Sequence, residues 1–479
     1  MTGTERCVDE CGRPSRAELI RGLGLSAAVS INVANMIGTG VFLKTRVMTC
    51  NVGSPWLVMA AWVAAGLLAL AGSFSYGEVA ALLPEAGGEY AFLRRAYGRI
   101  VGFLYGWTFF GIARSASQAA LAIGFATFLN QAAGHALEPT LLTVGPIALT
   151  GITLVSIAAI WIVALVNFRP VTTGGALAIG LTLIKIVLVA AVAATLLLFA
   201  HGQWGHLDMA LSSAATCEQV SGSARGGVIG FGAAMVGALW AYDGWQNVAP
   251  LAGEVKNPER NLPRAFVGGM LVVGALYIVA NLAYFYAMTP DQIGSTSLHS
   301  SVASDALGAT IGPAAVIVIL CILMVSSVGS LHASVLANSR IPYAMAREGL
   351  FFRSLSVVSQ RTNVPVRAIV AQASWASILA VMGNYDALTD SVVFASWLFY
   401  GLSAGSVFVF RRTMPDVPRP YRAFGYPVLP ILFLLVTTWL LVNSFVADAP
   451  RALLGAGYIA LGLPFYAWWT RKLPGVTRG

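Results

Sequence analysis

Twelve apolar runs, each long enough to cross a bilayer, restrict the fold of this chain more than any other feature. A spanning helix needs about 20 apolar residues, and in lipid only helices or closed barrels satisfy every backbone polar group. The runs cover residues 23–48, 54–80, 100–130, 143–167, 171–200, 226–252, 264–288, 312–345, 365–384, 388–410, 425–446 and 451–470. We therefore expect an all-α integral membrane protein with twelve transmembrane helices embedded in a lipid bilayer.

The distribution of basic residues supports this count of spans. If the N-terminus lies inside, inner segments hold 23 of the 29 Lys and Arg residues. The outer segments hold only four, which are Lys44, Arg46, Arg225 and Arg451. Cytoplasmic loops of membrane proteins carry such an excess of positive charge. The asymmetry predicts a multi-pass protein of the plasma (inner) membrane with both termini in the cytoplasm, and it accounts for the net charge of +9 without a nucleic-acid partner.

The chain divides into a short polar segment and one membrane domain. Residues 1–22 are polar, and we expect them to form a cytoplasmic N-terminal segment. The first apolar run is of spanning length, so it is expected to remain as a helix rather than to be cleaved as a signal peptide. Residues 23–472 are then a single twelve-helix domain joined by short loops.

Two glycines interrupt the first span at mid-depth. The segment ANMIGTGVF places Gly38 and Gly40 on either side of Thr39. Glycine inside a helix costs roughly 1 kcal/mol relative to alanine, and small residues also let membrane helices pack closely, so packing alone could explain the pair. A break would instead free helix N-terminal amides for a carboxylate. The carbonyls that end the preceding half-helix, near Met36 and Ile37, would suit an ammonium group, which makes the pair of groups a match for an α-amino acid.

A second break lies at equivalent depth in the sixth span. The segment GALWAYDGWQNVAP contains Asp243 and Gly244 near its middle. A carboxylate at the bilayer centre costs about 2–3 kcal/mol or more, so Asp243 should face a cavity or a partner. The aromatic residues expected to form the walls of this cavity are Trp240, Tyr242 and Trp245.

The positions of the two breaks predict an internal repeat. They fall in spans one and six, which correspond if residues 23–200 and 226–410 form two halves of five spans each. Interrupted helices at corresponding places in two inverted repeats mark the binding sites of many secondary transporters. Helices 11 and 12, at about residues 425–470, would lie outside this repeat.

Two cations and a glutamine lie within the spans. Lys185 is central in the fully apolar fifth span, so we expect a functional or ion-pairing role rather than snorkelling. A lysine beside the first break could take the place of a cotransported sodium ion, or could exchange protons if burial lowers its proton affinity. Arg114 lies one turn from Gln118, and both could line a polar cavity or have a structural role in the protein core.

The remaining polar residues indicate no enzyme, cofactor or metal site. The five histidines (135, 201, 206, 299 and 332) and the cysteines lack the spacing of metal ligands, and no nucleotide motif or catalytic triad is present. Transport would therefore be secondary rather than ATP-driven. Cys50 and Cys217 both fall on expected outer segments, which leaves a disulfide between them open.

Several stretches in order along the chain resemble the amino acid–polyamine–organocation (APC) superfamily, in particular its L-type amino acid transporter branch and bacterial amino acid permeases. The most specific is WAYDGWQNVAPLAGEVKNPERNLPRA, which joins span six to the loop before span seven. The others are MIGTGVF (36–42), PEAGGEY (84–90) and SRIPYAMAREG (339–349). Together they span nearly the whole chain.

The resemblance implies a LeuT-type fold of five plus five inverted spans and two further helices. It implies that the substrate carboxylate binds at Thr39, Gly40 and neighbouring amides, and that carbonyls of Met36, Trp240 and Asp243 bind the ammonium group. Trp240 would be an aromatic gate, and Lys185 would replace a sodium site. Animal members join a glycoprotein through a cysteine in the loop after span three; residues 131–142 contain no cysteine, so no disulfide-linked accessory subunit is expected.

These observations favour a sodium-independent exchanger or permease for L-amino acids that works by alternating access. A proton-coupled symporter and a non-transporting amino acid sensor of the same fold remain alternatives. Asp243 resembles the aspartate of branch members that accept cationic amino acids, and the choice between neutral and cationic substrates stays open.

Overall fold

A computed structural model of the chain describes residues 18–144, 147–297, 300–312, 314–382, 385–447 and 449–471. Helices dominate this part of the chain, and each of the twelve apolar runs overlaps at least one of them. The α-helices of the first half are α1 (Leu25–Met36), α2 (Gly40–Val52), α3 (Pro55–Leu82), α4 (Glu89–Tyr97), α5 (Arg99–Thr108), α6 (Arg114–Ala132), α7 (Gly151–Val166) and α8 (Val171–Phe199). Those of the second half are α9 (Gly227–Tyr242), α10 (Pro258–Ala287), α11 (Pro290–Gly294), α12 (Val302–Ile311), α13 (Ala314–Asn338), α14 (Arg340–Arg347), α15 (Val366–Met382), α16 (Tyr385–Thr413), α17 (Val428–Ala447) and α18 (Ala449–Arg471).

Several of these helices can cross a membrane by their length and apolar composition. Among the described residues, six are long enough as single spans, and α1 with α2 forms a seventh that bends by 43° at its break. Five shorter apolar helices accompany them, and four of these, α7, α9, α15 and α17, coincide with predicted runs. The protein is therefore a multi-pass membrane protein.

Three local features differ from regular spanning helices. The loop after α6 contains a two-stranded antiparallel hairpin, β1 (Thr140–Val144) and β2 (Ile147–Thr150), which the sequence did not indicate and which is a small addition to a mostly helical fold. Between α5 and α6 the third span passes through a π-helical turn at Phe109–Ala113, directly before Arg114. Such π turns often occur at functional sites. The sixth span ends its α-helix at Tyr242 and continues as turns and a 3₁₀ helix, η4 (Ala249–Glu254).

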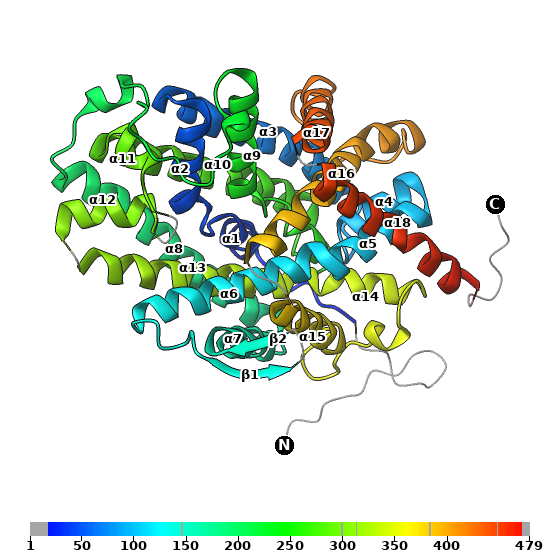
Figure 1. Cartoon of the computed structure of the whole chain (residues 1–479). Coiled ribbons are helices and arrows are strands. Elements are labelled where there is room, and N and C mark those ends of the chain that lie inside the picture. The colour runs from blue at the N-terminus through cyan, green and yellow to red at the C-terminus, as the bar shows by residue number, and fades with distance from the viewer. Residues whose placement is uncertain are drawn as a thin grey trace.

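The first span lies at the centre of the molecule (Figure 1). Helix α1 packs against α8, α10 and α13, while α2 packs against α9. Helix α3 packs against both α9 and α10. Spans one, two, six and seven therefore contact one another as a group, with both helix breaks inside it.

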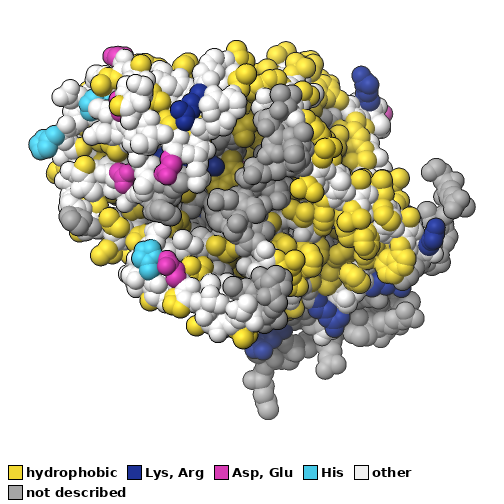
Figure 2. Space-filling view, in the orientation of Figure 1, with side chains coloured by type: hydrophobic (Ala, Val, Ile, Leu, Met, Phe, Trp, Pro, Cys, Tyr) yellow, Lys and Arg dark blue, Asp and Glu magenta, His cyan; other side chains and the backbone are white. Residues whose placement is uncertain are grey.

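Charged and hydrophobic side chains are unevenly distributed over one face of the molecule (Figure 2). In Figure 1 the short helices α11 and α12 lie at the left end, and α4 and α14 lie toward the right. On the face shown in Figure 2, acidic and histidine side chains gather at the left end, and hydrophobic side chains cover much of the right half, with Lys and Arg along its lower edge. Apolar side chains that are exposed on α3, α8, α10 and α13, such as Leu67, Val187, Leu271 and Ile317, form surface suited to lipid.

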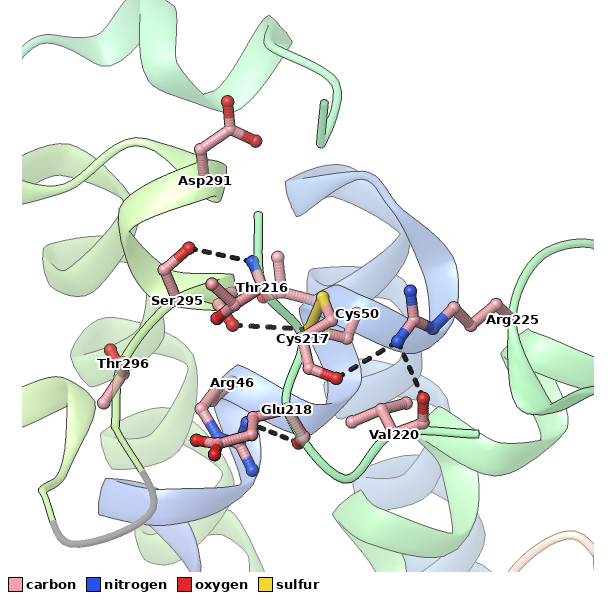
Figure 3. The surroundings of a disulfide bond; sticks show 12 residues. Arg46, Cys50, Thr216, Cys217, Glu218, Val220, Arg225, Asp291, Ser295 and Thr296 are labelled. Atoms are coloured by element: carbon pink, nitrogen blue, oxygen red, sulfur yellow. Dashed lines mark hydrogen bonds between the residues drawn. A yellow bond between two sulfur atoms is a disulfide. The ribbon is translucent and has the colours of Figure 1, made fainter. Parts of the chain in front are cut away.

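A disulfide bond joins Cys50 at the end of α2 to Cys217 in the long segment before α9 (Figure 3). The Cα atoms of the two cysteines are 5.7 Å apart. Hydrogen bonds hold the same segment in place: Arg225 donates to the carbonyls of Cys217 (3.1 Å) and Val220 (2.7 Å), and Arg46 donates to the carbonyl of Glu218 (2.9 Å). The pairing left open by the sequence is therefore present.

Candidate functional site

The first break separates α1 from α2 at Ile37–Thr39. Since α2 begins at Gly40, the amides of Gly40 and Val41 have no acceptor within the helix, whereas those of Phe42 and Leu43 donate to the Thr39 carbonyl (3.1 and 3.2 Å). A Cβ at Gly38 would meet only one atom within 4 Å, at 3.9 Å, so this residue presents bare backbone to open space. A Cβ at Gly40 would lie 2.6 Å from the Cβ of Ala241. The two glycines therefore serve different purposes: Gly40 allows close packing on α9, and Gly38 leaves the backbone accessible.

Lys185 lies directly beneath the first break and is 1% exposed. Its ammonium group donates to the carbonyls of Ala34 (2.7 Å) and Ile37 (2.8 Å) and to the Ser330 hydroxyl (2.7 Å). These three partners use all three of its donors. The lysine thus fixes the carbonyls that end α1 to helices α8 and α13.

The two carbonyls at the first break, those of Met36 and Ile37, already accept hydrogen bonds within the protein. The Met36 carbonyl accepts hydrogen bonds from the Tyr277 hydroxyl (2.6 Å) and the Gly38 amide (2.7 Å). The Ile37 carbonyl accepts from Lys185 and from Ser326 (2.8 Å). A carbonyl oxygen has two lone pairs, so neither has an unused one for a ligand.

The second break lies against the first. Gly244 adopts a φ of +107°, and a Cβ there would approach the Asn35 Cβ to 2.7 Å, so both its conformation and its packing require glycine. Tyr277 also donates to the Ala241 carbonyl (3.1 Å) and so joins the ends of α1 and α9 through one hydroxyl. The two interruptions therefore form a single structural unit.

A charged cluster closes one side of this unit. The Asp243 carboxylate lies 3.5 Å from Arg114 Nη1 and accepts a hydrogen bond from the Tyr400 hydroxyl at 2.7 Å. Arg114 also donates to the Tyr400 hydroxyl (2.8 Å), and Gln246 donates to Asp243 (3.3 Å). Asp243 thus has a cationic partner, as its cost in the membrane requires.

A cavity of about 90 Å³ lies between the two breaks and this cluster. Its lining includes seven of the residues predicted from the sequence, which are Met36, Gly38, Thr39, Gly40, Trp240, Asp243 and Gly244. Arg114 lines it as well. The cavity therefore offers backbone amides, a carboxylate and a guanidinium within one apolar enclosure.

Comparison with known proteins identifies the family. The amino acid permease family model matches residues 23–461. The chain belongs to the amino acid permease family. This confirms the family resemblance seen in the sequence motifs, and it makes the protein a member of a transporter family rather than an enzyme.

Individual relatives cover nearly the whole permease. It is 30% identical over 450 residues to the serine/threonine exchanger SteT of Bacillus subtilis, covering 93% of this chain and 95% of that protein. It is 29% identical over 460 residues to the human b(0,+)-type amino acid transporter 1, covering 95% and 88%. It is 26% identical over 467 residues to the human large neutral amino acids transporter small subunit 2, covering 94% and 81%.

Some predicted site residues of the permease lie elsewhere. Gln118 donates to the Ser334 hydroxyl on α13 (3.2 Å) and is not among the residues that line the cavity. Tyr242 packs against the Trp62 ring, and Trp245 packs against the Tyr76 ring at 4.6 Å, so neither forms a wall. Only Trp240 of the three aromatic residues lines the cavity, because Tyr242 lies two residues further along α9 and so on another face of that helix, and Trp245 follows the turn that ends it.

Other residues at the site were not predicted. Tyr400, Ser396 and Trp397 come from α16, and Tyr277 comes from α10. Ser326 and Ser330, on α13, bond the carbonyls at the end of α1. A serine or tyrosine within a spanning helix carries no local signal of this role, since such residues are also common in helix packing.

A second, larger cavity lies next to the permease cavity and shares one lining residue with it. Thr39 lines both the site and a vestibule of about 520 Å³ between α2, α6, α12 and α13. The Lys44 ammonium group lies 4.6 Å from the centroid of the Trp240 ring, at the junction of α2 and α9. The vestibule contains Asp305 and the hydroxyls of Ser300, Ser301 and Ser304.

The opposite side of the permease is closed by polar contacts. Arg340 on α14 and Glu254 on η4 form a fully buried ion pair at 2.7 Å. Leu23, just before α1, pairs with Val255 in an isolated backbone bridge, with Leu23 N donating to the Glu254 carbonyl at 2.9 Å. The larger cavity therefore lies toward the end that carries α12, and these contacts hold the chain together toward the end that carries α14.

No metal centre is found in the part of the permease that the structure describes. None of its His, Cys, Asp and Glu side chains gather in groups of three or more suited to a metal ion. His332 is a buried polar group that contacts Asn167 (3.0 Å) and the Gly174 carbonyl (2.9 Å). His299 lies outside the described residues.

Proposed function

We propose that this permease is a secondary transporter that moves L-amino acids across the plasma membrane by alternating access. The contact between two interrupted helices beside a small cavity carries this proposal. Family membership supports it, and so do relatives named as amino acid transporters and as a serine/threonine exchanger. The sensor alternative shares the fold and the binding site but predicts no flux.

The substrate backbone would be recognised by the breaks. The amides at Thr39 and Gly40 and the positive end of the α2 dipole would bind the carboxylate. The ammonium group would bind carbonyls at the end of α9, at Trp240 and Asp243. The Met36 and Ile37 carbonyls accept two hydrogen bonds each, so they would contribute to the ammonium site only if one of these bonds is exchanged.

The coupling mechanism would not require sodium. Lys185 donates to carbonyls of Ala34 and Ile37, the kind of oxygen ligand that an alkali cation would otherwise use. A fixed ammonium group at this position supplies the charge and the hydrogen bonds permanently. We therefore propose a sodium-independent exchanger or permease, with proton-coupled symport as the alternative.

The architecture would be the LeuT-type repeat with twelve spans and both termini inside. Spans one, two, six and seven contact one another as a group, which supports a bundle that rocks against the rest of the molecule. Trp240 would close the outer path above the bound amino acid. The cysteine-free loop after α6 supports the absence of a disulfide-linked accessory subunit.

Uptake by proteoliposomes tests this proposal. Purified permease is reconstituted with or without internal amino acids, and a panel of labelled L-amino acids is added in sodium or in choline buffer. Exchange predicts uptake that depends on internal substrate and is equal in both buffers. Sodium-dependent uptake would contradict the role given to Lys185. Binding of amino acids without flux would refute transport and support the sensor alternative.

A further inference from the structure

Glu89 is a buried carboxylate that the proposed transport site does not use. It is the first residue of α4 and is 1% exposed. The two glycines before it contact the segment that follows the second break. Gly87 N donates to the Pro250 carbonyl (2.9 Å), and a Cβ on Gly88 would lie 2.3 Å from the backbone of Ala249. Glu89 is therefore held by the same segment that follows Asp243, toward the end of the molecule that carries α14.

The surroundings of Glu89 are unusual for an ionised acid. Its Oε2 atom is fully buried and has no hydrogen-bond partner among the described residues. Burial raises the pKa of Glu89 to about 7, outweighing the hydrogen bond from its own backbone amide, the positive charge of Arg114 and the hydrogen bond from Tyr105, all of which lower this pKa. The carboxyl group therefore changes its charge near neutral pH.

Polar groups from five other parts of the chain interact with Glu89. Those that interact with it electrostatically are Tyr76 on α3, Tyr105 on α5, Arg114 on α6, Asp243 after α9 and Tyr400 on α16. The other neighbours of α4 are α14 and η4, whose charged groups have partners of their own. These are the Arg340–Glu254 ion pair and Arg347, which bonds Tyr343 (3.4 Å).

The charges in this cluster sum to zero only while Glu89 is protonated. Asp243 and Arg114 form one neutral pair at 3.5 Å. The Nε–H of Arg114 has no acceptor among the described residues, so the guanidinium can still bind a second anion. Ionisation of Glu89 gives the cluster a charge of −1 and lets Arg114 divide its attraction between two carboxylates. A pocket with a net negative charge suits a substrate whose side chain is cationic.

We propose that Glu89 is a proton-binding site that sets the charge selectivity of the pocket, and that a cationic amino acid and the Glu89 proton bind in competition. This rests on the proposed transport of amino acids. With a neutral amino acid, Glu89 keeps its proton. With arginine or lysine, the O–H bond of Glu89 breaks, the proton passes to the solution, and the carboxylate balances the added side-chain charge. The same pocket then holds the same total charge with either class of substrate.

Calorimetry measures the proton directly. L-arginine, L-lysine, L-leucine and L-serine are titrated into purified permease in nanodiscs at pH 6.5, in buffers of different ionisation enthalpy. We expect the cationic amino acids to release roughly half to three-quarters of a proton per molecule bound, because a group with a pKa of about 7 is mostly protonated at this pH. Neutral amino acids should release none. By linkage, affinity for arginine should rise from pH 5.5 to 8.5 while affinity for neutral substrates stays constant.

Three variants make the test specific. Glu89→Gln cannot ionise, so it should bind neutral amino acids normally, release no proton, and bind arginine roughly tenfold more weakly than wild type at pH 8. Glu89→Asp should retain the release. The matched control is Glu85→Gln, which changes a partly exposed carboxylate that pairs with Arg94 and Arg95 and should behave as wild type.

Each result decides between the two proposals. Proton release that persists in Glu89→Gln, or equal release with neutral and cationic amino acids, would overturn the role of Glu89. Binding of neutral amino acids without binding of arginine or lysine between pH 5.5 and 8.5 would overturn it while leaving the proposed transport intact. Failure to bind any amino acid would refute the proposed function itself.

Discussion

At the scale of single residues, the site depends on charges that are fixed by several partners at once. Lys185 uses all its donors on two carbonyls of α1 and one hydroxyl of α13. Asp243 is held by Arg114, Tyr400 and Gln246. Each charge therefore ties together several helices, which the proposed alternating access would move relative to one another, so its removal should affect transport more than local packing alone would.

Replacing Lys185 with methionine should lower uptake at least tenfold. Methionine has a similar length but no donors, so the Ala34 and Ile37 carbonyls would lose their charged hydrogen bonds, each worth about 1.5–3 kcal/mol. Lys185→Arg should not restore uptake, because a larger side chain has no room there. The lysine Cε lies only 2.7 Å from the position that a Cβ on Gly329 would occupy. Proteoliposome uptake measures the effect, with exposed Lys256→Met as the control. Uptake by Lys185→Met equal to the control would refute a role in coupling.

Replacing Asp243 with asparagine should impair arginine and lysine transport more than leucine transport. The substitution keeps the size and one hydrogen-bonding oxygen for Tyr400, but it leaves the Arg114 charge without its partner. A pocket with this excess positive charge should reject cationic side chains. Competition assays on reconstituted protein compare the substrates, and equal losses for leucine and arginine would remove Asp243 from charge selection.

At the scale of elements, each break needs a glycine for a specific contact. Gly40 has no room for a Cβ against α9, and Gly244 combines a positive φ with contact to Asn35. The α2–α9 contact brings the two breaks together, so it determines whether the cavity forms at all. The unusual cost of glycine in a spanning helix is thus offset by this close approach.

Gly40→Ala should therefore destabilise the permease, whereas Gly237→Ala in the interior of α9 should not. The new methyl group at residue 40 would lie 2.6 Å from Ala241, and overpacking of this kind costs typically 1–3 kcal/mol. At residue 237 the nearest atom is 3.5 Å away, an ordinary contact. Thermal unfolding in detergent compares the two variants with wild type. An equal melting temperature for Gly40→Ala would show that the breaks can separate without loss.

The sequence was sufficient to predict the features that have a local signature. Apolar length marks the spans, and a glycine or a charge at mid-depth marks the breaks, Lys185 and Arg114. The contacts of Tyr277, Tyr400 and Ser330 depend on which helices become neighbours, and nothing beside these residues in the chain indicates it. Trp245 was assigned to the wrong surface because the turn after Tyr242 departs from helical geometry. Glu89 was missed because its burial comes from helices distant in the sequence.

At the scale of the whole molecule, a covalent bond links segments far apart in the chain. The Cys50–Cys217 disulfide spans a sequence separation of 167 and holds the segment before α9 against α2. Cross-linking constrains the unfolded chain more as the closed loop lengthens, with typical gains of about 2–4 kcal/mol. Disulfides persist in oxidising compartments, so its presence also agrees with an outer location for these segments.

Cys50→Ser should lower the melting temperature without abolishing transport. The disulfide lies outside the substrate cavity, so its loss should affect the stability of the fold more than the affinity for amino acids. Thermal unfolding and uptake are measured on the same preparation, with Cys321→Ser as the control, since Cys321 is the one free cysteine among the described residues and is exposed. A loss of uptake with an unchanged melting temperature would instead place the disulfide in the transport mechanism.

The arrangement of open and closed ends predicts which side of the membrane reaches the site. The vestibule lies between α2, α6, α12 and α13, while the Arg340–Glu254 pair and the Leu23–Val255 bridge hold the other end together. If the basic end is cytoplasmic, this is an outward-open arrangement. A cysteine at Ser304 in the vestibule should then react with a membrane-impermeant thiol reagent added outside, in a background lacking Cys7, Cys11 and Cys321.

A cysteine at exposed Arg361, in the loop before α15, should react only when the membrane is permeabilised. Addition of a transported amino acid should slow the reaction of Ser304→Cys, because closure over the substrate narrows the vestibule, and should leave Arg361→Cys unaffected. Reaction of Arg361→Cys from outside would reverse the orientation. Unchanged reactivity of Ser304→Cys with a transported substrate would mean that the vestibule does not close over the site, and alternating access would then require a different moving element.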